Sequence, residues 1–300
     1  MKILVTGGAG FLGSHVADAL TEAGHEVFVF DLVESAYLRP GQTMIIGDVT
    51  NFEHVCDAVK GVDVIYHLAA LADIDKAIDR PRDTMSVNLM GTVNMLEAAR
   101  LCNVQRFIFS SSIYVYSDQG SFYRTSKQAC EHLIQDYHDR YGLNYSIVRY
   151  GSLYGPRADS SNAVFRMLKS ALEKGVITYG GSGKEVREYI HIRDAALMSA
   201  DVLDDRFENA ILHLTGRERM TTGEMLEMMK EILNNKVDIQ LNTQSVTGHY
   251  IQTPYNYTPR LGRKMTRETY IDIGLGLLDM IQFLDQDNPE THPPHGCIEE

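Results

Sequence analysis

The architecture of this chain follows from residues 2–31, KILVTGGAGFLGSHVADALTEAGHEVFVFD. The β-rich run at 3–5 leads into the glycine-rich sequence TGGAGFLG at 6–13. A helical pattern follows over 14–23, and a second apolar run at 27–30 ends at Asp31. These runs predict a strand, a tight turn, a helix and a second strand.

The glycines of the turn have separate tasks if the unit binds a dinucleotide. Gly7 permits a turn that a Cβ would obstruct, Gly10 lets the backbone approach a pyrophosphate, and Gly13 lets the helix pack close to the strand. The helix N-terminus adds free N–H groups and the positive end of its dipole. We therefore expect Gly7, Gly10, Phe11, Leu12 and Gly13 to hold the phosphates.

Asp31 indicates which dinucleotide is bound. Its carboxylate can accept hydrogen bonds from both hydroxyls of an adenosine ribose, and it would repel a 2′-phosphate. No arginine follows it. The prediction is NAD rather than NADP, with Asp31 and Leu32 in the cofactor site. The glycines alone would also suit an ordinary tight β–α turn, but the flanking strands, the helix and the acid favour the cofactor site.

Composition limits the class of protein. With 300 residues, 44% of them hydrophobic and 23% charged, the chain can bury a large core in one domain or in two coupled ones. A formal net charge of −12 argues against nucleic acid and anionic membrane surfaces as partners. The four cysteines have no metal-ligand spacing, so we expect reduced thiols and no metal. No apolar run reaches transmembrane length, and we expect a cytoplasmic protein.

Strand and helix patterns continue to alternate as far as residue 150. Strands are expected at 44–46, 62–68, 106–110 and 145–150, and helices at 52–59, 85–101 and 126–141. Such alternation produces crossover units and a parallel sheet with helices on both faces. The sequence therefore predicts an α/β fold in which residues 1–155 form a Rossmann-type, doubly wound parallel sheet that binds NAD.

The regular alternation of strand and helix patterns ends after residue 155. Helices are expected at 163–174, 221–233 and 271–284, a glycine-rich turn at 180–183 and a strand at 188–192. We interpret residues 156–300 mainly as a smaller C-terminal α/β cap that binds substrate. Part of 186–216 is expected to return to the first domain. In open sheets, ligands bind beyond the carboxyl ends of the strands, which the cap would cover.

Two segments are candidates for catalysis. The first, FIFSSS at 107–112, is a buried strand that ends in hydroxyls, and the second is YRTSK at 123–127. Tyr123 and Lys127 are four residues apart, which puts them on one face of a helix. A cationic Lys127 is expected to lower the pKa of Tyr123 from its usual value of about 10. The phenolate would then act as base toward a substrate hydroxyl that Ser112 holds by a hydrogen bond.

On these motifs the chain resembles the extended short-chain dehydrogenase/reductases, and within them the NAD-dependent nucleotide-sugar epimerases and dehydratases. The resemblance covers most of the chain. It depends on TGGAGFLG at 6–13, Asp31, GDV at 47–49, HLAA at 67–70, Asn88, the serines at 110–112, Tyr123 with Lys127, residues 149–157 and REYIH at 187–191.

The resemblance implies roles for further residues. Asp48 and Val49 would border the adenine, and Leu68, Ala69 and Ala70 would line the pyrophosphate and nicotinamide side. The cofactor site would also include Asn88, Ser110, Tyr123, Lys127 and Tyr150, with Lys127 on the nicotinamide ribose. The substrate site would include Ser111, Ser112, Ser152 and Arg187. Arg187 would grip the substrate diphosphate, a task suited to a guanidinium group.

Departures from the family pattern narrow the reaction. Dehydratases carry Asp-Glu directly after the catalytic hydroxyl, where this chain has Ile113 and Tyr114, and decarboxylases would be expected to carry a Glu there. The segment is closer to the epimerase pattern. Ser152 stands where many members have Asn. Only 11 positions separate Ser112 from Tyr123, because a longer loop of typical members is shortened. We expect the pocket to be more open, or to be closed by another part of the chain.

We therefore predict an enzyme that oxidises a hydroxyl of a nucleotide-activated sugar, at C4, by hydride transfer to NAD. As an epimerase, it would return the hydride to the other face of the keto sugar. A net C4 dehydrogenase or a 4-ketoreductase would use the same residues and stays open. A non-catalytic dinucleotide-binding protein is a third alternative, which the intact Tyr-Lys pair disfavours.

The expected partners are a nucleotide-diphosphate sugar and a second copy of the chain. Relatives pack the segments equivalent to 84–101 and 126–141 across a two-fold axis as a four-helix bundle, which implies a homodimer. Both segments carry apolar stripes, which suit equally well helices that pack only on their own sheet. The sequence identifies neither the sugar nor the nucleotide.

Overall fold

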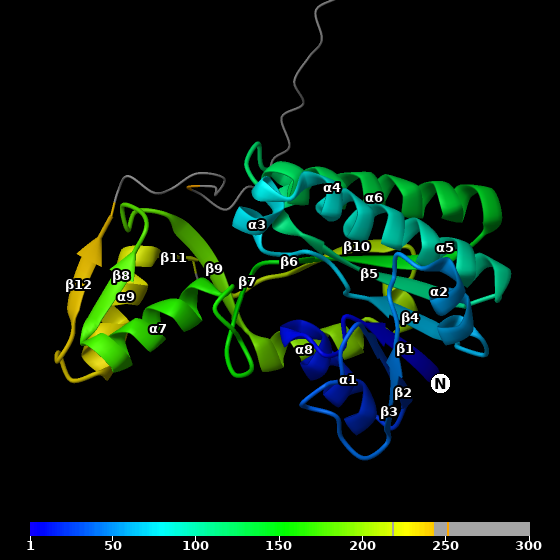
Figure 1. Ribbon diagram of the computed structural model, residues 1–300, viewed down its shortest axis with the longest axis horizontal. Coiled ribbons are helices and arrows are strands. Elements are labelled where there is room, and N and C mark those ends of the chain that lie inside the picture. Colours follow the sequence, from blue (N-terminus) through cyan, green and yellow to red (C-terminus); the bar gives the residue numbers. More distant parts are fainter. Residues whose placement is uncertain (218, 243–250, 252–300) are drawn as a thin grey trace, which may run out of the picture. The chain divides into compact units, whose positions relative to one another are not determined.

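The computed structural model describes residues 1–217, 219–242 and 251. They belong to one compact unit, Met1–Thr258, and Figure 1 shows their helices and strands. The helix expected at 271–284 lies outside the described residues. Within the described ranges, no helix has both the length and the apolar character that a membrane span requires.

A seven-stranded parallel sheet forms the centre of the unit, with the strand order β10-β6-β5-β4-β1-β2-β3. Its strands are β1 (Lys2–Thr6), β2 (Glu26–Asp31), β3 (Gln42–Ile46), β4 (Val64–His67), β5 (Arg106–Ser112), β6 (Asn144–Tyr150) and β10 (Ala210–Leu214). The chain builds outward from β1 to β3 and then crosses back to β4. The sheet is therefore doubly wound, as the sequence predicts, and its strand order reverses between β1 and β4.

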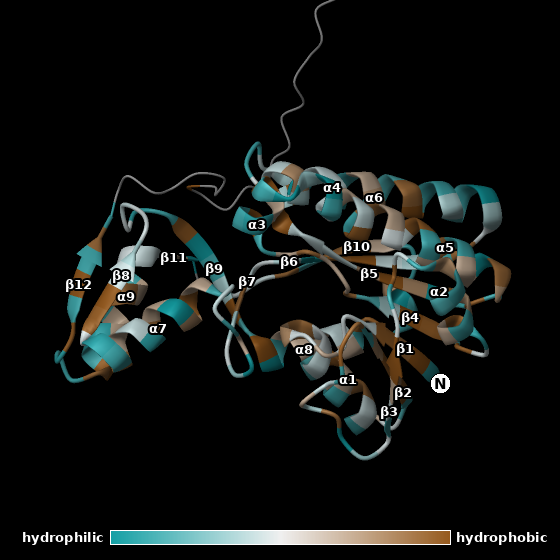
Figure 2. Cartoon of the chain, viewed as in Figure 1, coloured by the Kyte–Doolittle hydropathy of each residue, from teal (hydrophilic) through white to brown (hydrophobic). Residues whose placement is uncertain are grey.

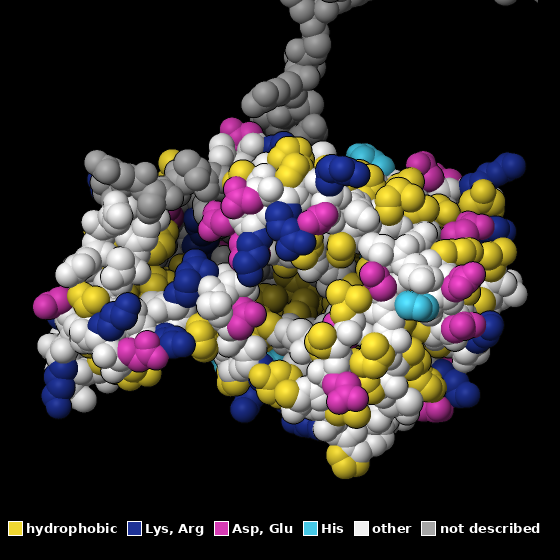
Figure 3. Space-filling model, in the orientation of Figure 1, with side chains coloured by type: hydrophobic (Ala, Val, Ile, Leu, Met, Phe, Trp, Pro, Cys, Tyr) yellow, Lys and Arg dark blue, Asp and Glu magenta, His cyan; other side chains and the backbone are white. Residues whose placement is uncertain are grey.

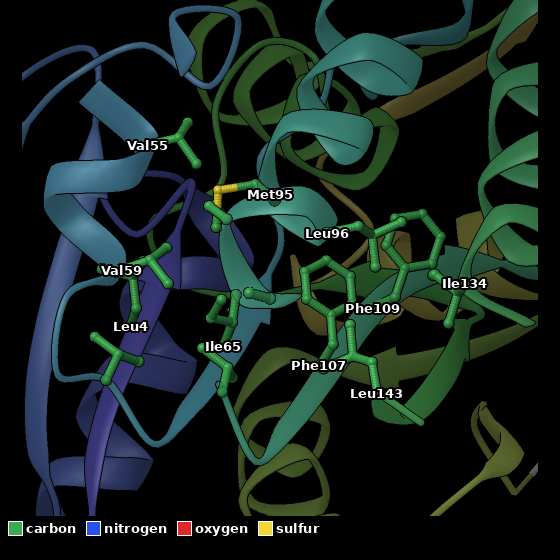
Figure 4. Packing of buried hydrophobic residues seen from close by; sticks show 14 of the residues in the cluster. Leu4, Val55, Val59, Ile65, Met95, Leu96, Phe107, Phe109, Ile134 and Leu143 are labelled. Atoms are coloured by element: carbon green, nitrogen blue, oxygen red, sulfur yellow. The ribbon is translucent and has the colours of Figure 1, made fainter. Parts of the chain in front are cut away.

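Helices cover both faces of this sheet (Figure 1). α2 (Phe52–Val59), α5 (Gly91–Leu101) and α6 (Ser121–Tyr141) contribute to one core, and α1 (Phe11–Glu22) and α8 (Ile192–Asp201) to the other. Alternate residues of one strand serve the two cores, since Leu4 belongs to the first and Ile3 and Val5 to the second. Figure 2 shows the hydrophobic central strands, and Figure 4 shows Phe107 and Phe109 of β5 packed near Leu96 and Ile134.

The segment before α5 differs from the single helix expected at 85–101. The chain forms α3 (Ile74–Asp79), α4 (Pro81–Thr84) and a π-helical segment η1 (Met85–Met90) before α5 begins. Arg80 has an extended φ of −126°, and Pro81 starts the next helix because it needs no N–H donor there. α3 begins with a side-chain cap, since Asp73 accepts from the N–H groups of Asp75 and Lys76.

The rest of the described chain forms two small sheets. One has the order β11-β9-β7 and the other pairs β12 with β8. Their strands are β7 (Ser152–Tyr154), β8 (Val176–Tyr179), β9 (Val186–His191), β11 (Arg219–Thr221) and β12 (Asp238–Leu241), accompanied by α7 (Ala163–Lys174) and α9 (Thr222–Ile232). Val164 and Met167 of α7 pack with Leu226 and Met229 of α9 in a third core.

Between these elements the chain returns to the central sheet. α8 packs in the second core, and β10 pairs in parallel with β6. The buried Arg106 of β5 fixes this return, because its Nη1 donates to the carbonyls of Val202, Leu203 and Asp204 at 3.1–3.2 Å. Two short 3₁₀ helices complete the described elements, η2 (Ile113–Tyr116) and η3 (Asp205–Phe207).

Candidate active site

Most of the predicted cofactor-binding and catalytic residues lie at the carboxyl edge of the central sheet. β1, β2, β4 and β5 are adjacent parallel strands, so the segments that follow them lie along one edge. The loops after β1 and β4 meet where the strand order reverses, which is the place where open α/β sheets bind dinucleotides.

The turn after β1 depends on two missing Cβ atoms. Gly7 has a φ of +67°, and a Cβ there would lie 2.8 Å from Cα of Ala69, in the loop after β4. A Cβ on Gly13 would lie 2.1 Å from the carbonyl oxygen of Gly7. The prediction for Gly7 is confirmed. Gly13 permits close packing as expected, but against the turn itself rather than against the strand.

The N-terminus of α1 has no side-chain cap. Gly10 occupies its cap position, and no acidic residue stands in the first turn. Several other described helices begin with a side-chain oxygen cap, α2 with Asn51, α3 with Asp73, α7 with Asn162 and α9 with Thr221, whereas α4, α5 and α6 also lack a side-chain cap. An uncapped helix start with half-exposed Phe11 and Leu12 leaves N–H donors for a phosphate group. The turn therefore fits the pyrophosphate of NAD.

Asp31 ends β2 beside this turn. Its Oδ2 accepts from the N–H of Ala9 at 3.0 Å, and its Oδ1 accepts from the N–H of Leu32 at 2.7 Å. Each carboxylate oxygen can accept a further hydrogen bond, so the geometry is compatible with ribose hydroxyls. The Leu32 side chain is exposed.

Asp48 and Val49 follow β3, at the far side of the same edge. Oδ1 of Asp48 accepts from the N–H of Thr50 at 2.8 Å, which closes the turn. Val49 is buried, and its carbonyl accepts from Nδ2 of Asn94 at 2.9 Å. The turn is therefore tied to α5.

A buried chain of hydrogen bonds, which the sequence pattern does not reveal, supports the loop after β4. The N–H of Ala69 donates to Oγ1 of Thr6 at 3.2 Å, and that hydroxyl lies 2.8 Å from Nδ1 of His67. Nε2 of His67 lies 3.1 Å from Oγ1 of Thr92, which itself donates to the carbonyl of Asn88. Because the Thr92 proton is used, Nε2 must carry the histidine proton and Nδ1 must accept.

His67 is a neutral structural group. Burial, and next the nearby charge of Lys127, lower its pKa to about 3. An imidazole with such a low pKa stays uncharged throughout the physiological range. The histidine of the HLAA motif therefore supports the loop that carries Leu68, Ala69 and Ala70. All three of these residues are half-buried.

Asn88 is also directed toward the protein. Its Oδ1 accepts from the N–H of Leu71 at 2.7 Å, and its Nδ2 donates to the carbonyl of Leu71 at 3.2 Å and to Oγ of Ser126 at 3.0 Å. The side chain joins the loop after β4 to α6. A contact with the cofactor stays a prediction, and the visible task of Asn88 is to position this loop.

The structure brings Ser112, Tyr123 and Lys127 together. Ser112 ends β5, and its side chain shares a hydrogen bond with the Tyr123 hydroxyl. Nζ of Lys127 donates to the carbonyl of Ser110 at 2.6 Å and lies 5.8 Å from the centroid of the Tyr123 ring. The end of a strand and the first turns of a helix thus form one cluster.

The pKa of Tyr123 differs from the sequence-based expectation. Burial raises it to about 12, against the opposing effect of the Ser112 hydrogen bond. Burial lowers the pKa of Lys127 to about 8, opposed by Cys130 and Glu131. The pKa of Tyr123 in the protein alone is therefore raised, and the lowering that the sequence predicts is not observed. The reason is that the ring is only 9% exposed, so desolvation of the phenolate dominates.

Neighbouring apolar side chains cover the Tyr123 ring. Ile74 and Ala77 of α3 pack against it, together with Tyr114. The Tyr114 ring meets it edge to face, with the centroids 6.4 Å apart. Segment 113–122 and α3 therefore enclose the Tyr123 side chain. A more open substrate pocket, as expected from the short segment between Ser112 and Tyr123, stays a prediction.

Two of the four candidate substrate residues, Ser152 and Arg187, lie on the sheet of β7 and β9. Ser152 pairs in register with Tyr189, and Arg187 precedes Tyr189 by two residues, so the three share one face. Arg187 is buried, and its Nη1 donates to the carbonyl of Val186 at 3.1 Å.

A hollow of about 530 Å³ lies beside these strands. Its lining includes Tyr154, Tyr189, His191, Asp194, Thr215 and Arg217. Figure 3 shows a hollow on the molecular face, with hydrophobic side chains in its depth and Lys and Arg side chains nearby.

Two predicted site residues point into the interior. Oγ of Ser111 donates to Oε1 of Glu131 at 2.5 Å. The Tyr150 hydroxyl lies 2.6 Å from Oγ of Ser199, which itself donates to Ala195, so the tyrosine is the donor. Burial raises the pKa of Tyr150. Both hydroxyls are hydrogen-bonded inside the protein, so a contact of Ser111 with substrate or of Tyr150 with the cofactor stays a prediction.

The described cysteines do not form a reactive or metal-binding group. Cys56, Cys102 and Cys130 are free thiols, and Cys297 lies outside the described residues. In the part of the chain that the structure describes, no cluster of three His, Cys, Asp or Glu side chains is arranged to hold a metal ion.

Comparison with known proteins adds independent information. A model of the NAD dependent epimerase/dehydratase family matches residues 3–211. The chain is 26% identical over 261 residues to the UDP-glucuronate 4-epimerase of Thermodesulfobacterium geofontis, which covers 78% of this chain and 81% of that protein. It is 29% identical over 287 residues to UDP-glucuronic acid decarboxylase 1 of Arabidopsis thaliana, which covers 85% of this chain and 63% of that protein.

A solved structure gives the same result. The UDP-glucuronic acid 4-epimerase from Bacillus cereus, in complex with UDP-glucuronic acid and NAD, superposes with a TM-score of 0.79. The two sequences are 26% identical, and the alignment covers 87% of this chain and 95% of that one.

Proposed function

Because this chain belongs to the NAD-dependent epimerase/dehydratase family, we propose that it is an epimerase that inverts C4 of a nucleoside diphosphate sugar. NAD is its cofactor. The observation that carries this proposal is the cluster of Ser112, Tyr123 and Lys127 at the sheet edge that also holds the uncapped turn before α1. Relatives of similar length are 4-epimerases of UDP-sugars.

The roles of the three residues follow from their contacts. The Tyr123 oxygen takes the proton of the C4 hydroxyl, and the Ser112 hydroxyl donates to the same phenolate and orients the sugar. The Lys127 ammonium contributes positive charge below the phenol ring, 5.8 Å from its centroid. When bound, NAD supplies a hydride acceptor and a positively charged nicotinamide. The turn at Gly7, Gly10 and Gly13 would hold its pyrophosphate.

The substrate class is supported by the face that Ser152, Tyr189 and Arg187 share. A buried guanidinium on that face suits a diphosphate, since its N–H groups can pair with two oxygens at once. The relative from Bacillus cereus binds UDP-glucuronic acid. We propose a nucleoside diphosphate sugar, with the base and the sugar left open.

Elimination or decarboxylation at this site finds less support. Ile113 and Tyr114 occupy the two positions after the Ser112 hydroxyl where acidic residues would be needed, and the Tyr114 ring packs on Tyr123. A net C4 dehydrogenase or 4-ketoreductase needs the same groups as an epimerase and is the second candidate. The hydrogen bond between Ser112 and Tyr123 disfavours a purely NAD-binding protein.

A panel of UDP-sugars tests these alternatives. The protein is incubated with NAD and UDP-glucose, UDP-N-acetylglucosamine or UDP-glucuronic acid, and the C4 configuration is followed by NMR together with NADH absorbance. An inverted sugar without net NADH supports the epimerase. Stoichiometric NADH without inversion would replace it by a dehydrogenase, and release of carbon dioxide by a decarboxylase.

We also propose a homodimer that pairs α5 and α6 with their copies. Met90, Leu101 and Tyr141 are exposed apolar side chains near these helices, and the Arg100 guanidinium lies 5.0 Å from the Tyr141 ring centroid. Light scattering should give twice the chain mass, and Leu101→Glu should shift it to a monomer. A monomeric wild type would contradict this proposal.

The domain division at residue 155 and the cytoplasmic location stay predictions.

A further inference from the structure

A buried carboxylate lies in α6 beneath the proposed catalytic residues. Glu131 follows Lys127 by four residues, so both occupy the same face of the helix, and both are buried. The proposed reaction assigns no task to Glu131. A buried carboxylate costs free energy unless it is paired, so its partners indicate what it does.

Three hydrogen bonds satisfy this carboxylate. Oε1 accepts from Nε of Arg149 at 3.0 Å, and Oε2 accepts from Nη2 of Arg149 at 2.6 Å. Oε1 also accepts from the Ser111 hydroxyl at 2.5 Å. The arginine belongs to β6 and the serine to β5. Glu131 therefore binds α6 to two neighbouring strands of the central sheet at their carboxyl ends.

The arginine is held in turn from its other side. Its Nη1 donates to the Tyr116 hydroxyl, and its guanidinium lies 4.6 Å from the centroid of the Tyr116 ring. The Tyr116 hydroxyl lies 2.9 Å from Nε2 of His213, on β10. The fork of Arg149 thus has little rotational freedom, and the connection extends from α6 to the edge strand of the sheet.

These contacts join the two elements that carry the proposed catalytic residues, β5 with Ser112 and α6 with Tyr123 and Lys127. Ser111 is flanked by Ser110, whose carbonyl accepts from Lys127, and by Ser112, which bonds Tyr123. Strand alternation sends the Ser111 side chain to the opposite side from its two neighbours, under the helix. One carboxylate therefore fixes the spacing between the strand with Ser112 and the helix with Tyr123 and Lys127.

We propose that the ion pair of Glu131 and Arg149, with Ser111, is a positioning device that holds β5 and α6 at the separation that catalysis requires. This inference rests on the proposed epimerase function. Neither residue touches the reacting atoms. A buried ion pair adds little net stability compared with apolar side chains of the same shape, so fixed geometry is the better reason for its presence.

The pair also acts on the charge of Lys127. The groups that face this ammonium are His67 from β4, Tyr123, Cys130 and Glu131 from α6, and the Ser110 carbonyl from β5. Burial lowers the pKa of Lys127, and the negative charge of Glu131 opposes that effect. Loss of the Glu131 charge therefore lowers the lysine pKa further.

The central test is Glu131→Gln, which keeps the shape of the side chain and removes its charge. We expect kcat to fall at least about tenfold with little change in KM, because alignment is lost while substrate binding is not. The fall of kcat at high pH should move to lower pH, since Lys127 loses its proton more easily. Asp136→Asn, an exposed carboxyl on the same helix, is the matched control and should change neither quantity.

A second measurement does not depend on activity. NMR titration of the Lys127 side chain in the protein alone should show a lower pKa in Glu131→Gln than in the wild type. If nucleotide sugars prove not to be substrates, this shift still tests the effect of Glu131 on Lys127. An unchanged Lys127 pKa together with unchanged kcat would overturn the inference.

Ser111→Ala is a second variant that tests the inference even if Glu131→Gln does not fold. It removes one of the three bonds and leaves the ion pair, so a smaller loss of kcat at nearly unchanged thermal stability is expected. If Ser111→Ala and Glu131→Gln lose stability in proportion but retain wild-type kcat, the contacts are purely structural and the inference fails.

Discussion

Two parts of the same sheet edge are built in opposite ways. The turn after β1 is made of backbone, with the cap position of α1 left open and Gly10 exposed. The cluster after β5 is made of side chains in the interior, where Tyr123 is 9% exposed and Lys127 3%. The turn after β1 can therefore donate hydrogen bonds to a charged ligand, whereas the cluster after β5 keeps its titratable groups away from water.

The difference explains why the two regions depend on different kinds of contact. A backbone turn needs the right residues at three or four neighbouring positions, and Gly7 and Gly13 meet that need locally. The interior cluster needs partners far away in the chain, such as Arg149 for Glu131. Substitutions in the first region should therefore alter cofactor affinity, and those in the second should alter turnover or its pH dependence.

The largest effect is expected for Tyr123→Phe. Removal of the proton acceptor should lower kcat by about 10²- to 10⁴-fold, because the C4 hydroxyl can no longer pass its proton to the phenolate. The dissociation constant for NAD, measured by calorimetry, should change little. Wild-type turnover in this variant would remove Tyr123 from the mechanism.

The next effect separates two glycines of one turn. In Gly13→Ala the new Cβ would lie 2.1 Å from the Gly7 carbonyl oxygen, and in Gly10→Ala it would lie 3.2 Å from the same atom. Gly13→Ala must displace backbone, so we expect it to lose about 1–3 kcal/mol of stability and to bind NAD much more weakly. Gly10→Ala should retain nearly the wild-type melting temperature. Equal melting temperatures for the two variants would contradict the geometry of this turn.

Asp31→Ala should have a smaller effect, confined to the cofactor. Loss of the ribose hydrogen bonds and of the bond from Ala9 should weaken NAD binding by about tenfold, equivalent to roughly 1–2 kcal/mol. The preference for NAD over NADP should decrease as well, since no carboxylate then repels the 2′-phosphate. Titration with both dinucleotides measures the ratio, and an unchanged preference would show that another group selects NAD.

A further effect is a pH dependence of stability in the second region. The folded-state pKa of Lys127 is lowered from 10.5 to about 8, so between these values the unfolded chain binds more protons than the folded one. Wild-type stability should therefore rise across this range relative to Lys127→Met, which cannot titrate. Melting temperatures of both proteins from pH 7 to pH 10 measure the difference. A constant difference would mean that Lys127 does not carry a lowered pKa.

Local patterns predicted most of the central sheet correctly. The runs at 3–5, 27–30 and 106–110 are strands, and Gly7 has the positive φ and the close backbone neighbour expected of a turn that a Cβ would obstruct. Helix boundaries were less accurate, since the helix expected at 85–101 consists of η1 (Met85–Met90) and α5 (Gly91–Leu101), and α6 begins at Ser121 rather than at residue 126. The comparison with relatives then supports the fold and the family independently.

The chemistry inside the cluster was harder to predict. Alternation along a strand is enough to predict that the Ser111 side chain points away from those of Ser110 and Ser112. The direction of the Tyr123 pKa shift depends on how deeply Ile74, Ala77 and Tyr114 bury the ring, which sequence spacing does not report. Long-range burial, rather than local pattern, decides such values.

The late return of α8 and β10 to the central sheet has a consequence for protein synthesis. Until residues 210–214 have left the ribosome, β6 is an unpaired edge strand. For the same period the Arg106 guanidinium lacks the carbonyls of residues 202–204. The sheet of the nascent chain therefore stays incomplete while about sixty residues of intervening sequence are made, and its open edge is exposed to aggregation until β10 pairs with β6.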